Sequence, residues 1–257
     1  TGLLSQHPEL GVLRKKARDF DERDKVALLD VQRRILRELP GIYRRLASCG
    51  HAAVSTSPYF HPILPLLVDV RHARRCLPHV PEDDLFAWPE DARTQLERAR
   101  SRMEEVLGEA PVGLWPSEGS VSPEAVAIAA EAGFQWLVTD EGILHASQRE
   151  QRGGWFGGWE LPGGMQGFFR DRDLSDRISF QYATRDPREA VAELLGAAAE
   201  RVDGGVLTIA LDGENPWECW ADAGKAFREA LFEGLRAGPV RGVNHAEAAR
   251  REPVGSV

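Results

Sequence analysis

The sequence predicts an α/β fold in which parallel strands alternate with helices. Strand-like and helix-like segments follow one another along most of the chain, and apolar runs such as 207–211 are typical of strands covered on both faces. In addition, five predicted strands end in polar or ionisable residues. Parallel strands bring such residues to one edge, where the active sites of α/β barrels lie. A barrel and an open sheet are both consistent with these patterns.

The elements are expected in the following order. Residues 1–50 are helical: apolar residues at helical spacing predict one helix that ends at Pro40 and a second that runs to Gly50. Later helices are expected over 89–107, from Ser122 to Gly133, from Asp186 to Gly204 and over 221–236. Parallel strands are expected near 52–57, 111–115, 135–139, 165–170 and 206–211.

Composition excludes several classes of protein. The 257 residues carry a formal net charge of −8, which disfavours a protein that binds the phosphate backbone of nucleic acids. No run of eighteen apolar residues is present, so no membrane-spanning helix is expected. The three cysteines lack CxxC spacing and indicate neither a disulfide framework nor a zinc knuckle. The first residues have no leader-like character, which predicts a cytoplasmic protein.

Glu118 is the first candidate catalytic residue. It follows Trp115, Pro116 and Ser117 just beyond a predicted strand, so a stiff turn beside an aromatic surface should hold its carboxylate. This setting suits a nucleophile, or a stabiliser of a cationic centre, next to a sugar ring. The alternative is a surface glutamate near the start of the helix at Ser122, where the helix dipole favours negative charge.

Asp212 is the second candidate. It ends an apolar strand and precedes Gly213, so its carboxyl group should project into a cleft. Burial beside apolar walls raises a carboxyl pKa, as a general acid requires. Glu214 and Glu218 lie close by in DGENPWECW and are expected to pair with arginines. Two carboxyl groups flanked by indoles match the requirements of glycoside hydrolysis.

Other polar and aromatic residues are expected to line the same cleft. Three of them follow or end predicted strands: His61, Asp140 and Arg170. A metal site built from Asp140, Glu141 and His61 is a weaker interpretation, because the seven histidines are scattered. The glycine-rich loop 151–164 should lie beside the cleft mouth, with Trp155 or Trp159 as a sugar platform. The alternative is that both indoles fill a core beneath the loop.

Four stretches of the chain resemble glycoside hydrolase family 57, whose α-glucan-active members include α-amylases, amylopullulanases, branching enzymes and 4-α-glucanotransferases. These stretches cover 55–67, 113–144, 168–182 and 207–218. The pairing of WPSE at 115–118 with DGENPWE at 212–218 is specific. The chain looks most similar to the α-amylase and amylopullulanase side of this family.

The resemblance implies one catalytic domain with a (β/α)7-type barrel: a helical segment 1–50, a barrel core 51–240 and a polar tail 241–257, expected to fray from Asn244. The barrel is expected to be incomplete. The family's first strand carries a His-Gln-Pro motif that is missing here, and the C-terminal helical region is short.

The resemblance also implies a retaining hydrolase of α-1,4- or α-1,6-glucans that forms a covalent glycosyl-enzyme, with Glu118 as nucleophile and Asp212 as general acid/base. A transglycosidase and a non-catalytic carbohydrate-binding homologue are the alternatives. No cofactor, metal, nucleic acid or membrane is expected as a partner, and the substrate is an α-glucan or maltooligosaccharide. The full expected set of substrate-binding residues is His61, Trp115, Asp140, Trp155, Trp159, Arg170 and Trp217.

Overall fold

The computed structural model describes residues 6–79, 85–147, 156–202 and 204–257. Its centre is one sheet with the strand order β1-β2-β3-β5-β4-β6. Four strands run parallel to their neighbours: β1 (Ser55–Thr56), β2 (Gly113–Leu114), β3 (Trp136–Asp140) and β5 (Gln166–Arg170). The edge is extended by β4 (Trp159–Glu160), antiparallel to β5, and by β6 (Gly255–Ser256). The predicted α/β class with parallel strands is confirmed.

Three helices cover one face of the sheet: α4 (Leu64–Val68), α5 (Pro89–Leu107) and α6 (Pro123–Glu131). Leu114 and Leu137, which are 1% exposed, pack against the apolar sides of these helices. The two longer helices, α5 and α6, begin at the residues that the sequence indicated. Pro89 opens α5, which ends at Gly108, and the Ser122 hydroxyl accepts a hydrogen bond from the Ala125 amide at the start of α6.

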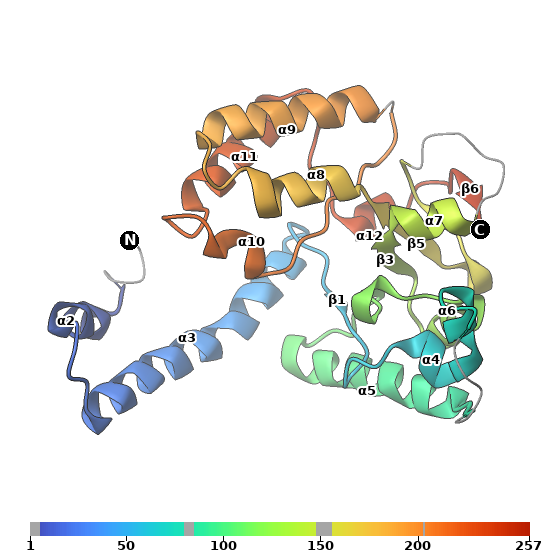
Figure 1. Ribbon diagram of the computed structural model, residues 1–257, viewed down its shortest axis with the longest axis horizontal. Coiled ribbons are helices and arrows are strands. Elements are labelled where there is room, and N and C mark those ends of the chain that lie inside the picture. The colour runs from blue at the N-terminus through green and yellow to red at the C-terminus, as the bar shows by residue number, and fades with distance from the viewer. Residues whose placement is uncertain (1–5, 80–84, 148–155, 203) are drawn as a thin grey trace.

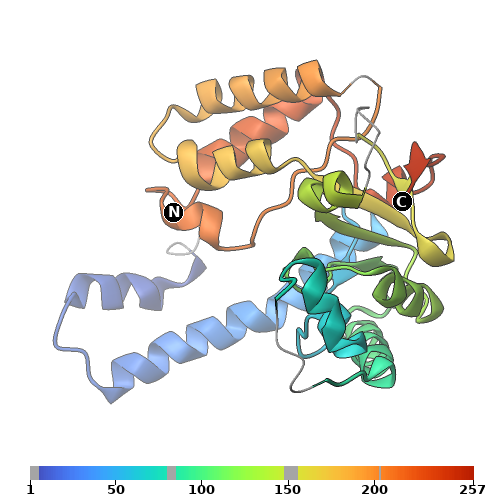
Figure 2. The same ribbon diagram turned by 45° about the vertical axis from the view of Figure 1, so that its right-hand side comes forward.

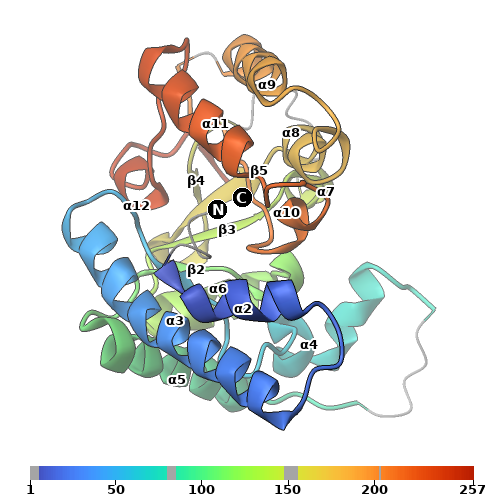
Figure 3. The same cartoon turned by 90° about the vertical axis from the view of Figure 1, so that its left-hand side faces the viewer.

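A second group of helices lies beyond the end of β5 (Figure 1). It contains α8 (Arg172–Asp176), a π-helical turn (Arg177–Gln181), α9 (Pro187–Arg201), α10 (Asn215–Glu218) and α11 (Lys225–Ala237). Tyr182 and Phe227 are fully buried between them and form the centre of this cluster. Figure 3 shows the two helical groups on opposite sides of the strands.

The segment 206–211 was expected to be a regular strand, and this prediction is wrong in part. Among the described residues, Thr208 forms an isolated parallel bridge to Arg170, and its carbonyl accepts a hydrogen bond from the Asp171 amide at 2.8 Å. The segment thus runs parallel to β5, as predicted. A longer ladder does not form, because the Ala210 amide donates to the Ser175 hydroxyl of α8 instead.

The N-terminal region contains α2 (Pro8–Lys16) and the 27-residue helix α3 (Glu22–Ser48). The prediction that Pro40 ends a helix is wrong, since α3 continues through it. A proline removes one amide donor from the ladder, but the hydrogen bonds of the following turns remain, and the Leu46 carbonyl anchors the chain beyond the helix. Most of α3 projects away from the sheet, with α2 alongside its first half (Figures 1 and 2).

The C-terminal tail was expected to fray from Asn244, and this prediction is also wrong. Residues 245–248 form α12 (His245–Ala248), and β6 pairs with β4. The His245 ring stacks on Trp136 at a centroid distance of 5.3 Å and meets Phe168 edge-on at 5.1 Å. These contacts hold the tail against the sheet face opposite α4, α5 and α6. Within the described residues, none of the helices has the length and apolar character needed to span a membrane.

Candidate active site

The carboxyl ends of the parallel strands meet at one edge of the sheet. Asp140 at the end of β3 lies opposite Arg170 at the end of β5, and Thr208 is aligned with Arg170. The turns after β2, β3 and β5 and the segment after Thr208 therefore leave the sheet on the same side. These turns carry Glu118, Asp140, Arg170 and Asp212, the polar residues that the sequence placed at strand ends.

Glu118 occupies a constrained turn immediately after β2. It is the middle residue of a 3-10 turn (Ser117–Gly119) and has a left-handed backbone conformation, φ 55° and ψ 22°. That conformation costs a residue with a side chain about 1–2 kcal/mol and persists only where the surroundings enforce it. Here the Thr139 hydroxyl of β3 donates to the Gly119 carbonyl at 2.5 Å, and the Ser117 side chain is fully buried. The turn thus holds an exposed carboxylate on a rigid base.

Asp140 and Arg170 are brought into direct contact. Arg170 Nε donates to Asp140 Oδ2 at 2.8 Å, and Arg172 Nη2 donates to Oδ1 at 2.5 Å. The Gly142 amide donates a third hydrogen bond at 2.9 Å. Burial opposes ionisation of Asp140, but the hydrogen bonds from Arg172 and Arg170 hold its pKa below the usual value. Asp140 therefore positions two guanidinium groups at the strand ends.

Glu141 and Asp171 follow Asp140 and Arg170 directly in the chain. Burial raises the pKa of Glu141, and the neighbouring charge of Asp171 adds to that effect. Asp171, 1% exposed, accepts two hydrogen bonds from Arg201 at 2.6 and 2.8 Å and caps α8 through the Leu174 amide. The sequence interpretation missed Thr139 and Arg172; the run RDR directly after β5 was the available signal for Arg172.

Asp212 is exposed, so the expected burial of its carboxyl group between apolar walls is wrong in this structure. The side chain accepts a hydrogen bond from Asn215 Nδ2 at 2.8 Å, at the start of α10. Residues 213–215 are exposed as well, because the chain leaves the bridge at Thr208 and passes over the surface before α10 begins. Asp212 is thus oriented by its own turn.

His61 and Trp115 lie on the segments after β1 and β2. His61 is exposed and, like Glu118, has a left-handed backbone with φ 56°. Its amide donates to the Pro58 carbonyl at 2.9 Å, which closes a tight turn. Trp115 is partly buried against Trp136, Val138 and Phe168, and its amide extends the β1–β2 pairing to the Thr56 carbonyl. Their expected contacts with a sugar stay predictions.

Trp159, one of the two tryptophans expected as a sugar platform, is buried in this structure. Trp159 lies on β4 instead of a loop, is 4% exposed and packs with Leu144 and Phe169. Its partner across the ladder is Gly167, three residues before the carboxyl end of β5. The indole is therefore enclosed away from the strand ends, as the core alternative required of Trp159. Trp155 lies outside the described residues.

Trp217 lies in α10 and is partly buried against the α11 side of the helical group. The Arg228 guanidinium stands 4.8 Å from the centroid of its ring, and the Phe227 ring lies at 6.3 Å. Gly224, with φ 71°, lets the backbone approach this indole so closely that an added Cβ would meet it at 2.3 Å. Packing thus fixes the orientation of the tryptophan of the DGENPWE motif. In the described part of the chain, no three metal-ligating side chains are gathered into a metal site.

Comparisons with solved structures show the same fold in longer proteins. An α-amylase from Thermotoga maritima matches 100% of this chain with a TM-score of 0.69 and 15% identity. A 4-α-glucanotransferase from Thermococcus litoralis matches 90% with a TM-score of 0.66 and 18% identity. A family 57 branching enzyme from Pyrococcus horikoshii matches 97% with a TM-score of 0.64 and 14% identity.

The chain spans 61%, 34% and 56% of those three proteins, respectively. Curated protein sequences gave no significant match. The family model described as glycosyl hydrolase family 57 matches residues 25–254, which is most of the chain and includes both WPSE and DGENPWE. The resemblance inferred from the motifs is confirmed: the chain belongs to glycosyl hydrolase family 57.

Proposed function

We propose that this chain is the catalytic part of a retaining α-glucan hydrolase. The observation that carries the proposal is the turn at Glu118, where a carboxylate follows a parallel strand in an enforced left-handed conformation. Strain of this kind concentrates at functional sites. Family membership and the names of the similar structures, an α-amylase, a glucanotransferase and a branching enzyme, support an α-glucan as substrate.

In the proposed first step, Glu118 attacks the anomeric carbon while Asp212 donates its proton to the leaving glycosidic oxygen. The carbon–oxygen bond to the leaving sugar breaks as the ester to Glu118 forms. In the second step, Asp212 takes a proton from water, which displaces Glu118 and releases the sugar with its original anomeric configuration. Two carboxyl groups about 5–5.5 Å apart are needed in the substrate complex.

The charged residues around the strand ends are compatible with the proposed roles of Glu118 and Asp212. Asp140 is ionised and forms ion pairs with Arg170 and Arg172. These three side chains therefore form a fixed polar cluster at the strand ends. Arg170, whose side chain is 27% exposed, retains donors that can reach a sugar hydroxyl. Trp115 and Trp217, both partly buried, are the proposed aromatic surfaces for sugar rings.

The test is product analysis with amylose, glycogen and defined maltooligosaccharides, resolved by size. Wild-type protein is expected to shorten the chains. Glu118→Gln and Asp212→Asn should each lower the rate about 10³-fold or more. Glu214→Gln and Glu218→Gln are matched controls, because these exposed carboxylates belong to the same motif and should leave the rate within a few-fold. Wild-type rates in both Glu118 and Asp212 variants would refute the assignment.

Azide rescue distinguishes the two roles. With an activated α-glucosyl fluoride, azide should rescue Glu118→Ala with inversion, because it then replaces the missing nucleophile. Azide should rescue Asp212→Ala with retention, since it attacks the intermediate that Glu118 has formed. Redistributed chain lengths without net hydrolysis would identify the protein as a transglycosidase. Retarded migration on glucan without conversion would identify a binding homologue.

A further inference from the structure

The long helix α3 exposes an apolar stripe that no part of the described chain covers. Six side chains at helical spacing form the stripe, each 37–61% exposed: Leu28, Leu29, Leu36, Leu39, Tyr43 and Leu46. A helix of 3.6 residues per turn places them on one side along about 30 Å. The helix α2 also contacts α3, with Glu9 of α2 paired to Arg34, and Val31 of α3 is buried. An aligned apolar surface of this kind marks an interaction site.

Charge along α3 is separated between its two halves. Residues 21–30 contain four acidic and two basic side chains, whereas residues 31–45 contain five arginines and one glutamate. Two copies of α3 laid antiparallel therefore bring a negative half against a positive half at both ends. A parallel pair would oppose like charges along its whole length. Charge complementarity thus selects a second copy in antiparallel orientation.

The shape of the molecule favours the same arrangement. The last turns of α3 join the body next to α5, while its first turns lie far from the sheet (Figure 1). An antiparallel pair puts the two bodies at opposite ends of the helices, where they do not collide. The pairing is also isologous, with identical surfaces meeting about a two-fold axis, as in most homodimers.

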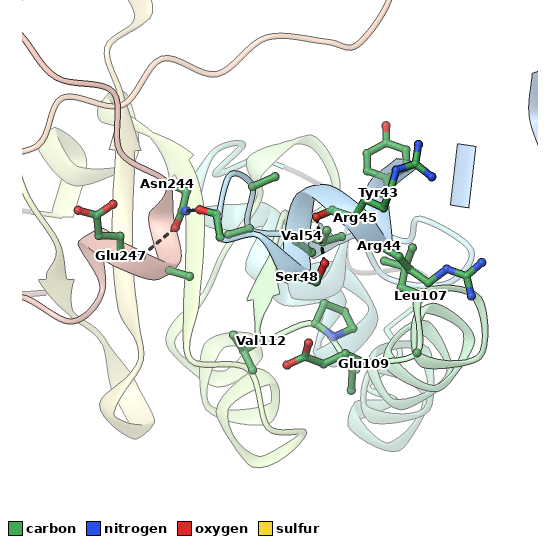
Figure 4. A pocket seen from close by; sticks show the side chains of 18 of the residues that line it. Tyr43, Arg44, Arg45, Ser48, Val54, Leu107, Glu109, Val112, Asn244 and Glu247 are labelled. Atoms are coloured by element: carbon green, nitrogen blue, oxygen red, sulfur yellow. Dashed lines mark hydrogen bonds between the residues drawn. The ribbon is translucent and has the colours of Figure 1, made fainter. Parts of the chain in front are cut away.

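A cavity of about 810 Å³ lies where α3 reaches the body, and Tyr43 belongs both to it and to the stripe. Its walls combine apolar side chains, among them Val54, Leu107 and Val112, with charged ones such as Arg44 and Glu109 (Figure 4). These residues belong to the amino-end side of the strands, away from Glu118 and Asp212. The cavity is therefore separate from the candidate active site.

The alignment of the two antiparallel helices determines which side chain of the second copy reaches this cavity. Packing Leu29 against the second copy's Leu36 places Glu22 beside the second copy's Arg44. The same register brings Phe20, which precedes α3 and is 58% exposed, to the level of the second copy's Leu46. Phe20 thus arrives at the edge of the cavity that Tyr43 and Ala47 form. We propose that two copies of this chain pair through antiparallel α3 helices and insert Phe20 reciprocally into each other's cavity.

The area is consistent with a specific dimer. In this register residues 22–43 of the two α3 helices overlap over about 33 Å, and at a width of about 10 Å the helix pair alone covers about 330 Å² per copy. An inserted phenylalanine buries about 150–250 Å², and the cavity wall that it covers adds a similar area. The result approaches the roughly 800 Å² per partner of a standard interface. Phe20 is thus needed for a stable pair.

Analytical ultracentrifugation over a concentration series tests the dimer. The wild-type protein should sediment as a dimer that dissociates on dilution and more readily in high salt. Leu36→Glu and Phe20→Ala should each weaken the dimer about 30-fold or more in Kd. Phe232→Glu and Phe180→Ala are matched controls on α11 and the π-helical turn, 60% and 79% exposed, and should leave Kd unchanged. Circular dichroism confirms that each variant is folded.

Charge exchange and cross-linking test the orientation. Arg44→Glu or Glu22→Arg alone should weaken the dimer, and the double variant should restore it. With the three exposed cysteines replaced by serine, Leu29→Cys copies mixed with Leu36→Cys copies should form mainly the mixed disulfide. Disulfides formed mainly between two Leu29→Cys copies would show a parallel pair and overturn the proposal. A wild-type monomer at all concentrations, or a dimer unaffected by Leu36→Glu, would overturn it as well.

Discussion

Protonation of His245 should destabilise this protein as the pH falls below neutrality. The ring lies between Trp136 and Phe168 on the sheet face, and its Nε2 is 3.3 Å from the Thr208 hydroxyl. Burial lowers the pKa of His245 from 6.5 to about 4, because these neighbours replace the water that would stabilise an imidazolium. The folded chain therefore keeps this histidine neutral at a pH at which the unfolded chain protonates it.

The sign and the size of the change in the free energy of unfolding follow from this difference in pKa between the folded and unfolded states. Above pH 6.5 the ring is neutral in both states and contributes no pH dependence. Between pH 6.5 and about 4 the unfolded state binds a proton that the folded state does not, so the free energy of unfolding decreases as the pH falls. The loss reaches about 3 kcal/mol at about pH 4, since one pKa unit corresponds to about 1.4 kcal/mol. That is a large part of the stability of an ordinary domain.

Urea unfolding followed by tryptophan fluorescence, at several pH values from neutral down to about 4, measures the effect. His245→Gln keeps a neutral side chain that can bond to Thr208, so its stability should lack this step. The difference in unfolding free energy between wild type and His245→Gln should shift by about 3 kcal/mol over that range, and taking the difference cancels the titration of carboxylates. His51→Gln, at an exposed histidine, is the control. Equal pH slopes in wild type and His245→Gln would refute the reasoning.

Three further changes test the site and its supports. Thr139→Val removes the hydrogen bond to the Gly119 carbonyl and should lower kcat on an α-glucan about 10-fold with little change in KM, while Thr139→Ser should restore it; an unchanged kcat would separate that bond from catalysis. Asp171→Asn removes the buried carboxylate that Arg201 contacts, while Arg201 keeps its pair with Asp173, so the change should cost about 1–3 kcal/mol in urea unfolding, an effect that an added Arg201→Met should reduce. Trp159→Ala should lower stability by about 3–5 kcal/mol and leave glucan affinity unchanged in affinity electrophoresis, whereas weaker glucan binding would contradict its assignment to the core.

Short-range signals in the sequence were sufficient for the elements whose ends depend on neighbouring residues. The helix that starts after Asp186 does so because the Asp186 carboxylate accepts hydrogen bonds from the amides of Arg188 and Glu189, and the sequence alone indicates that cap. The apolar runs of β3 and β5 predicted buried parallel strands, because this signal also lies within each segment. Their polar ends then predicted that Asp140 and Arg170 would lie at the same edge of the sheet, and the two side chains are joined there by a hydrogen bond of 2.8 Å.

Features that depend on partners distant along the chain could not be predicted in this way. Residues 206–211 have the composition of a strand, but Ser175 takes a hydrogen bond that a ladder would use. Trp159 is enclosed because β6, far along the chain, pairs with its strand. The polar tail is ordered because His245 finds an aromatic surface on β3 and β5. Residue types and their spacing specify what a segment can form, whereas burial and pairing depend on surfaces that exist only once the chain has folded.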